Sequence, residues 1–390
     1  MLNLITEIIQ KFGPRTAGSE AEKNAQLFMV EKCKSVTDKV QLLEFEAYLN
    51  ARFGKLKYYC AVFFIALVLY FVSPIAALII SFINALAFVF DFMTYRVVLE
   101  SFPGPLMKSW NVEASLEPQG EVKNTLIFSG HIDSVFEFKW WYKLGQHGIH
   151  LNIVAGILMV LLPLFYVFMI AFPEGNWHWY MWIAIVILSP STVTYFNMHG
   201  ANPVAGACDN LSGVAIAFEV FKNFADANNK GKSVLKNTRL KFVSFGSEET
   251  GLTGSCKYVE AKADELKKEN AHVINIDSIR LPEAICIIKA ETMNGTSYDK
   301  NLIAQLQNCF GAVNIPIKTG VTPIGGTDGV FFIRAGIPAV SIIGLGMDKL
   351  DPTYHTRRDV VENVNPIALD NAANGLAEFV RQWDDRGDKK

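Results

Sequence analysis

Four short apolar runs, each leading into histidine, aspartate or glutamate, constrain the fold of this chain more than any other feature. Such runs, rich in Val, Ile and Phe and bounded by glycine, predict buried strands. The carboxyl ends of neighbouring parallel strands meet at one edge of an open α/β sheet, where ligands bind. We therefore expect polar side chains from distant parts of the chain to converge at that edge. The runs, with the residues to which they lead, are Asn124 to Gly130 (His131, Asp133), Leu240 to Phe245 (Glu248, Glu249), Ala271 to Ile276 (Asp277) and Ala339 to Gly346 (His355).

Each of these acidic residues also has an ordinary structural explanation. A pair such as Glu248-Glu249 usually lies on a solvated turn, and Asp209, at the entrance of a predicted helix, stands where an N-cap is expected. The repetition of the pattern favours a shared site instead. Two histidines and several carboxylates form a hard nitrogen and oxygen donor set, which suits zinc or manganese.

A second feature is a pair of long apolar blocks. Tyr58 to Phe90 carries no charged residue, with Ser73-Pro74 near its middle, and the second block runs from Leu151 to Phe172 and from Trp177 to Phe196. A membrane span needs about 20 residues, so each block predicts a transmembrane hairpin of two spans. For Tyr58 to Phe90, one long kinked helix and a re-entrant hairpin are alternatives; a buried core helix is the alternative for either block.

The two blocks interrupt one domain rather than separating two, because strand-like segments both precede and follow the first block. The predicted domain comprises residues 1–50, 109–137 and 200–390, and the inserts comprise residues 56–96 and 138–199. Lysine and arginine gather at the domain-side ends of the inserts, so the positive-inside rule places the domain in the cytoplasm. The predicted fold is α/β, a mostly parallel twisted sheet with helices on both faces, interrupted by two transmembrane helical hairpins in a lipid bilayer.

Composition narrows the class of partner and compartment. The chain has 36 basic and 38 acidic residues among 390, and this balance argues against a nucleic-acid partner. Its mean hydropathy of +0.22 is high for a soluble enzyme and agrees with lipid contact. The six cysteines show no metal-type CxxC spacing, which fits a reducing compartment better than a disulfide framework.

The first fifty residues read as the opening of a soluble α/β domain. Met1 to Gly13 predicts a short amphipathic helix that carries charges and is therefore not a cleavable signal peptide. Ser19 followed by Glu22 forms a capping-box start for a helix to about Cys33. Val40 to Tyr48 then predicts a strand.

Five separated motifs resemble those of the di-zinc aminopeptidase family, the zinc exopeptidase family that also contains glutamate carboxypeptidase, glutaminyl cyclase and the transferrin receptor. The likeness extends to residues 13–25, GPRTAGSEAEKNA, and covers most of the sequence outside the inserts. The motifs are Gly130-His131-Ile132-Asp133-Ser134, Ala207-Cys208-Asp209-Asn210 with Ser212-Gly213, Ser247-Glu248-Glu249 with Gly251 and Gly254-Ser255, Ile276-Asp277, and Tyr354-His355-Thr356 with Asp359.

The resemblance implies two zinc ions per chain and a role for each motif residue. Asp209 would bridge the two ions, His131 and Asp277 would complete one site, and Glu249 and His355 would complete the other. Glu248 would be the general base for a water between the metals. Asp133 would orient His131 from behind. Tyr354 would either assist at the oxyanion or merely pack against its neighbours.

Two departures from the family pattern stand out. The apolar inserts are not part of the usual soluble fold, and Gly329 in Gly326-Thr327-Asp328-Gly329 replaces the histidine of the family's Ser-Asp-His stretch. The resemblance therefore implies a membrane-anchored metallo-exopeptidase that acts on peptides, most simply an aminopeptidase. A one-zinc acyl transferase like glutaminyl cyclase and a non-catalytic module like the transferrin receptor are the alternatives. The sequence leaves open the side-chain preference, the oligomeric state and which peptide end is cleaved.

Overall fold

The computed structural model describes residues 1–96, 100–229, 235–345 and 351–386, and the chain divides into two compact units. The first, here the sheet unit, comprises Met1–Ala47, Met107–Phe136 and Asn202–Lys390. The second, here the helical unit, comprises Tyr48–Leu106 and Glu137–Ala201. Each unit is assembled from separate stretches of sequence.

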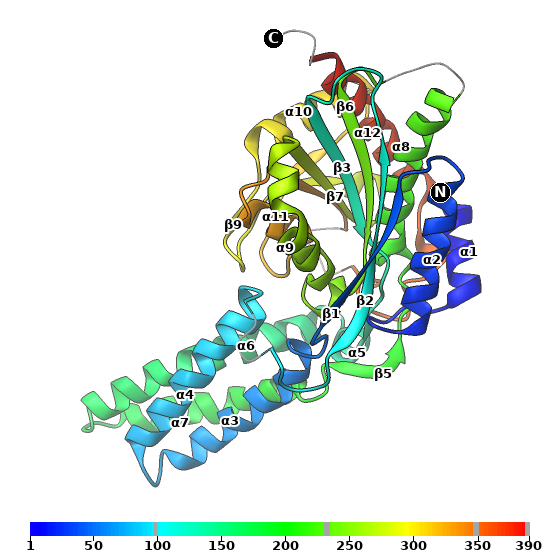
Figure 1. The fold of residues 1–390 in the computed structure, drawn as a ribbon. Coiled ribbons are helices and arrows are strands. Elements are labelled where there is room, and N and C mark those ends of the chain that lie inside the picture. Colours follow the sequence, from blue (N-terminus) through cyan, green and yellow to red (C-terminus); the bar gives the residue numbers. More distant parts are fainter. Residues whose placement is uncertain (97–99, 230–234, 346–350, 387–390) are drawn as a thin grey trace. The chain divides into compact units, whose positions relative to one another are not determined.

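A single mixed sheet organises the sheet unit, with strand order β1-β2-β6-β3-β7-β11-β8-β10 and β9 paired to β8 (Figure 1). Its four central strands, β6, β3, β7 and β11, are parallel neighbours. The strands are β1 (Val40–Ala47), β2 (Met107–Leu116), β3 (Asn124–His131), β6 (Thr238–Phe245), β7 (Ala271–Ile279), β8 (Cys286–Glu291), β9 (Thr296–Ser297), β10 (Lys318–Thr322) and β11 (Ala339–Gly344).

The sheet is mixed rather than mostly parallel, which corrects the expectation from sequence. β1 pairs antiparallel with β2, β2 with β6, and β11 with β8. The register explains the first pair, because Ala47, the last residue of β1, lies opposite Met107, the first residue of β2. The intervening insert thus leaves and re-enters the sheet at one point, as a hairpin loop does, and the returning strand must run in the opposite direction.

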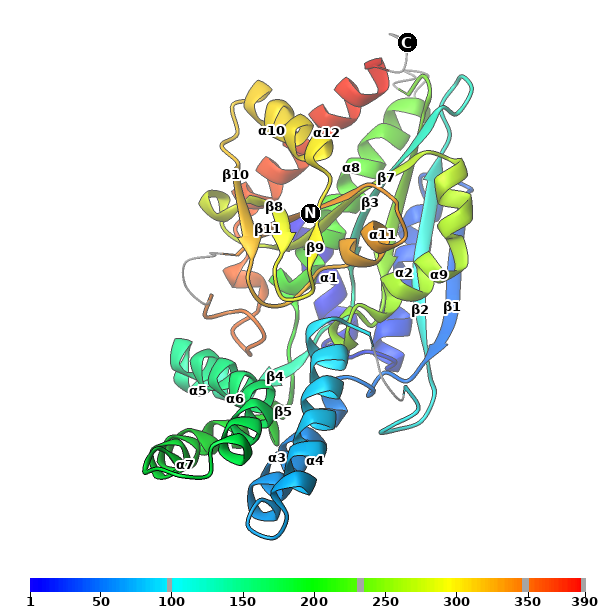
Figure 2. The same cartoon turned by 90° about the vertical axis from the view of Figure 1, so that its left-hand side faces the viewer.

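Helices cover both faces of this sheet, as expected. Figure 1 shows α9 and α11 on one face and α1, α2, α8 and α12 on the other, while α10 packs against α12 (Figure 2). The helices are α1 (Leu2–Phe12), α2 (Glu20–Lys34), α8 (Ser212–Asn229), α9 (Thr253–Lys268), α10 (Lys300–Ala312), α11 (Gly329–Arg334) and α12 (Pro366–Arg386).

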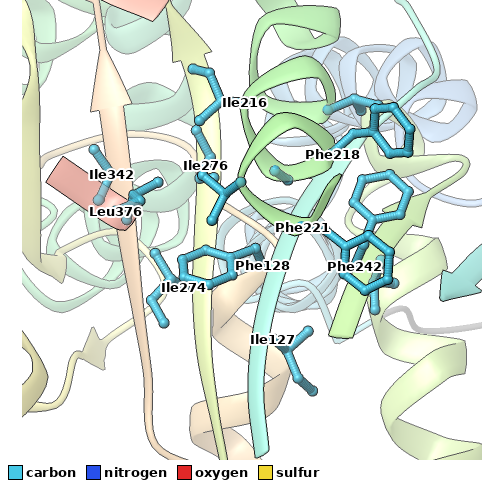
Figure 3. Close-up of a cluster of buried hydrophobic side chains, with 14 of the residues drawn as sticks. Ile127, Phe128, Ile216, Phe218, Phe221, Phe242, Ile274, Ile276, Ile342 and Leu376 are labelled. Atoms are coloured by element: carbon cyan, nitrogen blue, oxygen red, sulfur yellow. The ribbon is translucent and has the colours of Figure 1, made fainter. Parts of the chain in front are cut away.

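The core lies between the central strands and α8 (Figure 3). Phe218 and Phe221 of α8 pack on Phe242 of β6, with ring centroids 5.6 and 6.3 Å apart, and all three rings are buried. Ile127 and Ile274 from β3 and β7 are fully buried in the same cluster. Burying such side chains contributes about 1.5–3 kcal/mol each, so the strands that carry the candidate ligands are firmly held.

The helical unit contains α3 (Leu56–Leu69), α4 (Pro74–Phe88), α5 (Lys139–Leu144), α6 (Gln146–Ala171) and α7 (Trp177–Leu188). Ser73 caps α4 and Pro74 takes its first position, where the missing N–H costs nothing. The chain therefore forms two helices here and not one long kinked helix. β4 (Phe136–Phe138) pairs with β5 (His199–Pro203) on either side of the second insert.

Two helices in the described residues are long and apolar enough to cross a membrane, where the sequence predicted four spans. They are Pro74–Met93, which includes the π-helical turn after α4, and Gln146–Ala171. α3 and α7 have only 14 and 12 residues, which at 1.5 Å per residue gives about 21 and 18 Å against a hydrocarbon core of about 30 Å.

Candidate metal centre

The structure brings together all seven site residues predicted from sequence, at the carboxyl ends of the central strands. His131 ends β3, Asp133 follows two residues later, and Asp277 lies in the last turn of pairing of β7. Glu248 and Glu249 form a short 3₁₀ turn after β6. Asp209 precedes α8, and His355 lies in the segment after β11. All seven side chains are buried.

Asp209 lies between the two histidines. Its Oδ1 is 3.2 Å from Nε2 of His131, and its Oδ2 is 3.2 Å from Nε2 of His355. Glu249 Oε2 lies 3.3 Å from the same His355 nitrogen. One carboxylate that faces a different imidazole with each oxygen has the geometry of a bridging ligand.

Ligand atoms converge in two overlapping groups. One oxygen or nitrogen from each of His131, Asp209 and Glu249 lies within 4.8 Å of the others, and so do atoms of His131, Glu248 and Asp277. Hard oxygen and imidazole donors at this spacing fit Zn²⁺, which takes His nitrogen and carboxylate oxygen at about 2.0–2.2 Å.

The electrostatics of the cluster also call for a cation. Burial, reinforced by neighbouring carboxylates, raises the pKa of Glu248 and Glu249 well above the ordinary value, and raises the pKa of Asp277 to about 6. Burial alone would lower the pKa of His131, but the charges of Glu248 and the nearby aspartates raise it. Crowded buried carboxylates of this kind are stabilised in the ionised form by a bound metal.

Two further buried carboxylates fix the backbone that carries the ligands. Asp133 accepts hydrogen bonds from the amides of Glu248 and Glu249, both at 3.0 Å, and its Oδ1 lies 3.3 Å from Nδ1 of His131. Asp359 accepts from the amides of Cys208 and Asp209 at 2.6 and 3.1 Å. Asp133 thus orients both a histidine and the Glu-Glu turn, which is more than the sequence predicted for it.

A fully buried arginine ties the ligand loops together. Arg15 donates from Nε to the carbonyl of Ile132 at 2.7 Å and from a terminal nitrogen to the carbonyl of Gly206 at 3.2 Å. Burial lowers its pKa to about 10, and the charges of Asp133 and Asp359 oppose that shift. Sequence reasoning placed Arg15 in a family-like motif but gave it no role, because its partners are carbonyls that no residue pattern reveals.

Asp328 is a second residue that the sequence did not assign to the site. Its side chain is fully buried, and neither carboxylate oxygen has a hydrogen-bond partner in the described part of the chain. Burial raises its pKa to about 7, and its charge helps to raise the pKa of Glu248. Asp328 therefore belongs to the electrostatic surroundings of the predicted general base.

The space beside Gly329 is filled by a tyrosine. A Cβ on Gly329 would lie 2.8 Å from Cε1 of Tyr298 and 2.9 Å from Oγ of Ser341. The Tyr298 hydroxyl donates to Glu291 at 2.6 Å and lies 2.8 Å from Oγ1 of Thr327. The polar cluster around Tyr298 thus occupies the place that a larger residue at position 329 would need.

Tyr354 stacks on His355, with ring centroids 3.9 Å apart and an interplanar angle of 27°. Of the two roles considered for it, this contact accounts for the packing role.

Comparisons with known proteins agree with this arrangement. The profile of peptidase family M28 matches residues 189–380, a range that contains every predicted ligand except His131. Among curated proteins, aminopeptidase YwaD of Bacillus subtilis is 27% identical over 175 residues, which is 43% of this chain and 36% of that protein. Leupeptin-inactivating enzyme 1 of Streptomyces exfoliatus is 25% identical over 190 residues, 44% of this chain and 40% of that protein. The match thus spans well under half the length of these relatives.

Solved structures share the fold over nearly the whole chain. A zinc aminopeptidase from Bacillus subtilis superposes with a TM-score of 0.59 at 15% identity, covering 98% of this chain and 94% of the other. Glutaminyl cyclase from Porphyromonas gingivalis superposes with a TM-score of 0.57 at 14% identity, covering 98% and 96%. Together with the sequence matches, these findings identify the family: residues 189–380 belong to peptidase family M28, and by family the chain is a metallopeptidase.

Proposed function

We propose that this protein is a membrane-anchored zinc exopeptidase that removes residues from the amino end of peptides. The bridging position of Asp209 between His131 and His355 is the observation that carries the proposal, because it prepares a site for two metal ions. The curated relatives named above are aminopeptidases or a peptide-inactivating enzyme, which supports peptides as the substrate class.

Each residue of the centre has a defined task in this proposal. His131, Asp277 and Asp209 would hold one zinc ion, and Asp209, Glu249 and His355 the other. When bound, such ions lower the pKa of water and polarise a carbonyl group. Glu248 takes a proton from the attacking water and delivers it to the leaving amine; a raised pKa suits a group that must both accept and donate a proton.

The residues around the ligands keep this geometry fixed. Asp133 holds His131 in one orientation and aligns the amides of Glu248 and Glu249. Asp359 does the same for the amide of Asp209. A ligand whose own hydrogen bonds are satisfied in this way loses little entropy when metal or substrate binds.

The helical unit is the proposed membrane anchor, with the sheet unit on the cytoplasmic side. Apolar side chains on it are unusually exposed: Phe71 at 74%, Val72 at 81% and Trp179 at 71%. Exposed apolar surface of this extent marks contact with lipid or with another protein. The predicted domain of residues 1–50, 109–137 and 200–390 would then be the peptidase, and residues 56–96 and 138–199 the two hairpin inserts.

The two hairpins reach different depths in this proposal. Tyr70, at the tip of the first hairpin, stacks on Tyr166, and Phe71 stacks on Trp182. Tyr166 lies five residues before the end of α6, so the second hairpin extends about 7 Å beyond the first at 1.5 Å per residue. The first tip is apolar and would end within the lipid, whereas the second, with Glu174, would reach the far interface.

A second candidate function is cyclisation of an amino-terminal glutaminyl residue with a single zinc ion. The fold likeness to bacterial glutaminyl cyclases favours it as the alternative. The presence of a complete two-metal donor set favours hydrolysis over both this reaction and a non-catalytic binding role.

A direct test separates these activities. The detergent-purified protein is assayed on a panel of amino-acid p-nitroanilides and, in parallel, on glutaminyl peptides followed by mass spectrometry for loss of ammonia. Release of p-nitroaniline that stops with chelator and returns with zinc supports the exopeptidase. Cyclisation without p-nitroaniline release would replace it with the acyl transferase, and neither activity in a zinc-loaded sample would contradict catalysis.

A further inference from the structure

Glu22 of α2 is a fully buried carboxylate, and the proposed mechanism assigns it no role. It accepts hydrogen bonds from four donors on three segments of the sheet unit. Oε1 accepts from the amide of Ser247 at 2.7 Å and from its hydroxyl at 3.1 Å, and Oε2 accepts from the amide of Gly18 at 2.8 Å and the hydroxyl of Ser109 at 3.0 Å. The side chain is 0% exposed.

The capping box predicted from Ser19 and Glu22 forms only in part. Oγ of Ser19 accepts from the amide of Glu22 at 3.1 Å, as such a motif requires. The glutamate should in return accept from the amide of Ser19. It binds the amide of Gly18 instead and uses its other oxygen on Ser247, more than two hundred residues along the chain.

Ser247 is the residue directly before the proposed general base, and its backbone is held in an uncommon conformation. Its φ of 55° lies in the left-handed region, which non-glycine residues seldom adopt. The next two amides, of Glu248 and Glu249, donate to Asp133. Two buried carboxylates thus bind three consecutive amides and fix the turn from both sides.

The preceding glycine allows this close approach. A Cβ on Gly246 would lie 2.8 Å from Oε1 of Glu22 and 2.5 Å from the carbonyl of Trp110. The chain gives up a side chain at this point, and α2 delivers a carboxylate into the space.

Stability alone does not account for a carboxylate in this position. Removing an ionised group from water is costly, and apolar side chains of the same volume often stabilise a buried site better. A directional acceptor is needed only where a particular backbone geometry must be kept.

We propose that Glu22 is a positioning residue for catalysis, which acts through Ser247 to set the direction of the Glu248 side chain and the place of the Glu249 ligand. This inference rests on the proposed function for its catalytic consequence and on the hydrogen bonds alone for the positioning itself. It assigns a task to α2 that neither the metal ligands nor their immediate supports include.

Glu22→Gln tests the inference with a side chain of the same shape. Because an amide places a donor where the carboxylate has an acceptor, either the amide of Ser247 or that of Gly18 loses its partner. Glu22→Met removes both acceptors at similar volume, so that an effect of volume is excluded. Glu20→Gln, an exposed glutamate in the first turn of the same helix, is the matched control.

Three readouts are compared among the variants. Hydrogen exchange followed by mass spectrometry should become about tenfold faster or more in the segment of residues 246–250, where opening is local, and stay unchanged in Glu20→Gln. The kcat for an amino-acid p-nitroanilide should fall about 10- to 100-fold, the range expected for a misplaced catalytic group, with KM little changed. The visible absorption bands of the cobalt-substituted protein should shift, since they report ligand geometry and not stability.

Unchanged exchange at residues 246–250 in both variants would overturn the inference, whatever the activity of the protein. Faster exchange with wild-type kcat would also overturn the catalytic part of it. Faster exchange in a protein whose wild type hydrolyses no substrate would uphold the positioning and reject the proposed function, so the two failures are distinguishable.

Discussion

At the scale of single residues, Asp209 and Glu248 lie in one buried cluster but hold different positions in it. Asp209 contacts both histidines, whereas Glu248 approaches only His131, at 3.6 Å. Glu248→Ala should therefore keep its metal and lose kcat by about 10²–10⁴-fold, the usual contribution of a general base. Asp209→Ala should lose metal as well. Metal analysis and kinetics of both variants check this, and a Glu248→Ala protein that retains wild-type turnover would remove the mechanism.

A second prediction concerns pH and the far side of β2. Burial raises the pKa of Glu113, but Lys241, Lys262 and the hydroxyl of Tyr258 outweigh it, and the net shift is downward. The native state thus keeps this carboxylate ionised to a lower pH than the unfolded chain does. Its contribution is present above pH 4.5 and is lost as the pH falls through the lowered native pKa.

Glu113→Gln should accordingly cost about 1–3 kcal/mol of unfolding free energy at neutral pH, and the difference from wild type should shrink below about pH 4.5. Urea unfolding of both proteins at several pH values measures it. A difference that grows on acidification would contradict the assigned sign.

The candidate site was predictable at this scale where residue type and position in a strand coincide. His131, Asp277 and the Glu248-Glu249 pair all follow apolar runs, and the runs alone indicate where they meet. Arg15, Glu22 and Asp328 escaped prediction for another reason: their partners are backbone groups or distant carboxylates, and the sequence around them carries no sign of those contacts.

At the scale of elements, the four central strands were predictable because each is a continuous apolar run buried on both faces. The antiparallel strand pairs were not, since direction depends on where an insert returns to the sheet. β8 and β10 were missed for a related reason. Lys289 on β8 and Lys318 on β10 are exposed, so these edge strands lack the uniform burial of the centre.

One element-scale prediction compares two glycines with opposite surroundings. Gly329→Ala at the start of α11 forces a Cβ to within 2.8–3.0 Å of the buried Tyr298 and Ser341 side chains, so it should destabilise by about 1–3 kcal/mol through overpacking. Gly311→Ala within α10 meets nothing within 4 Å and should stabilise by about 0.5–1 kcal/mol. Thermal unfolding of both variants measures the contrast, and equal effects would contradict the packing around Tyr298.

At the scale of the whole molecule, the open question is how the helical unit meets the bilayer. Sequence predicted two hairpins of equal reach, because both blocks lack charge throughout. The aromatic contacts at Tyr70 and Phe71 changed that expectation to two hairpins of unequal depth. Contacts between side chains far apart in sequence are not visible in hydropathy.

Cysteine labelling in sealed vesicles tests this arrangement. In a Cys256→Ser background, Glu174→Cys should react with a membrane-impermeant maleimide only from the side opposite an exposed reference site, Glu121→Cys. Val72→Cys should react from neither side, because the first tip lies in lipid. Labelling of Glu174→Cys from the same side as the reference would refute the crossing, and labelling of Val72→Cys would refute the unequal depth.

The measurement that tests the central claim most directly is the zinc content of the purified full-length protein, taken alongside chelator-sensitive p-nitroanilide hydrolysis. The bridging position of Asp209 predicts about two zinc ions per chain, the number for which such a carboxylate is arranged, and activity that falls as they are removed. One zinc ion per chain without hydrolysis would contradict the two-metal exopeptidase and favour the cyclase-like reaction, and no bound metal at all would contradict both.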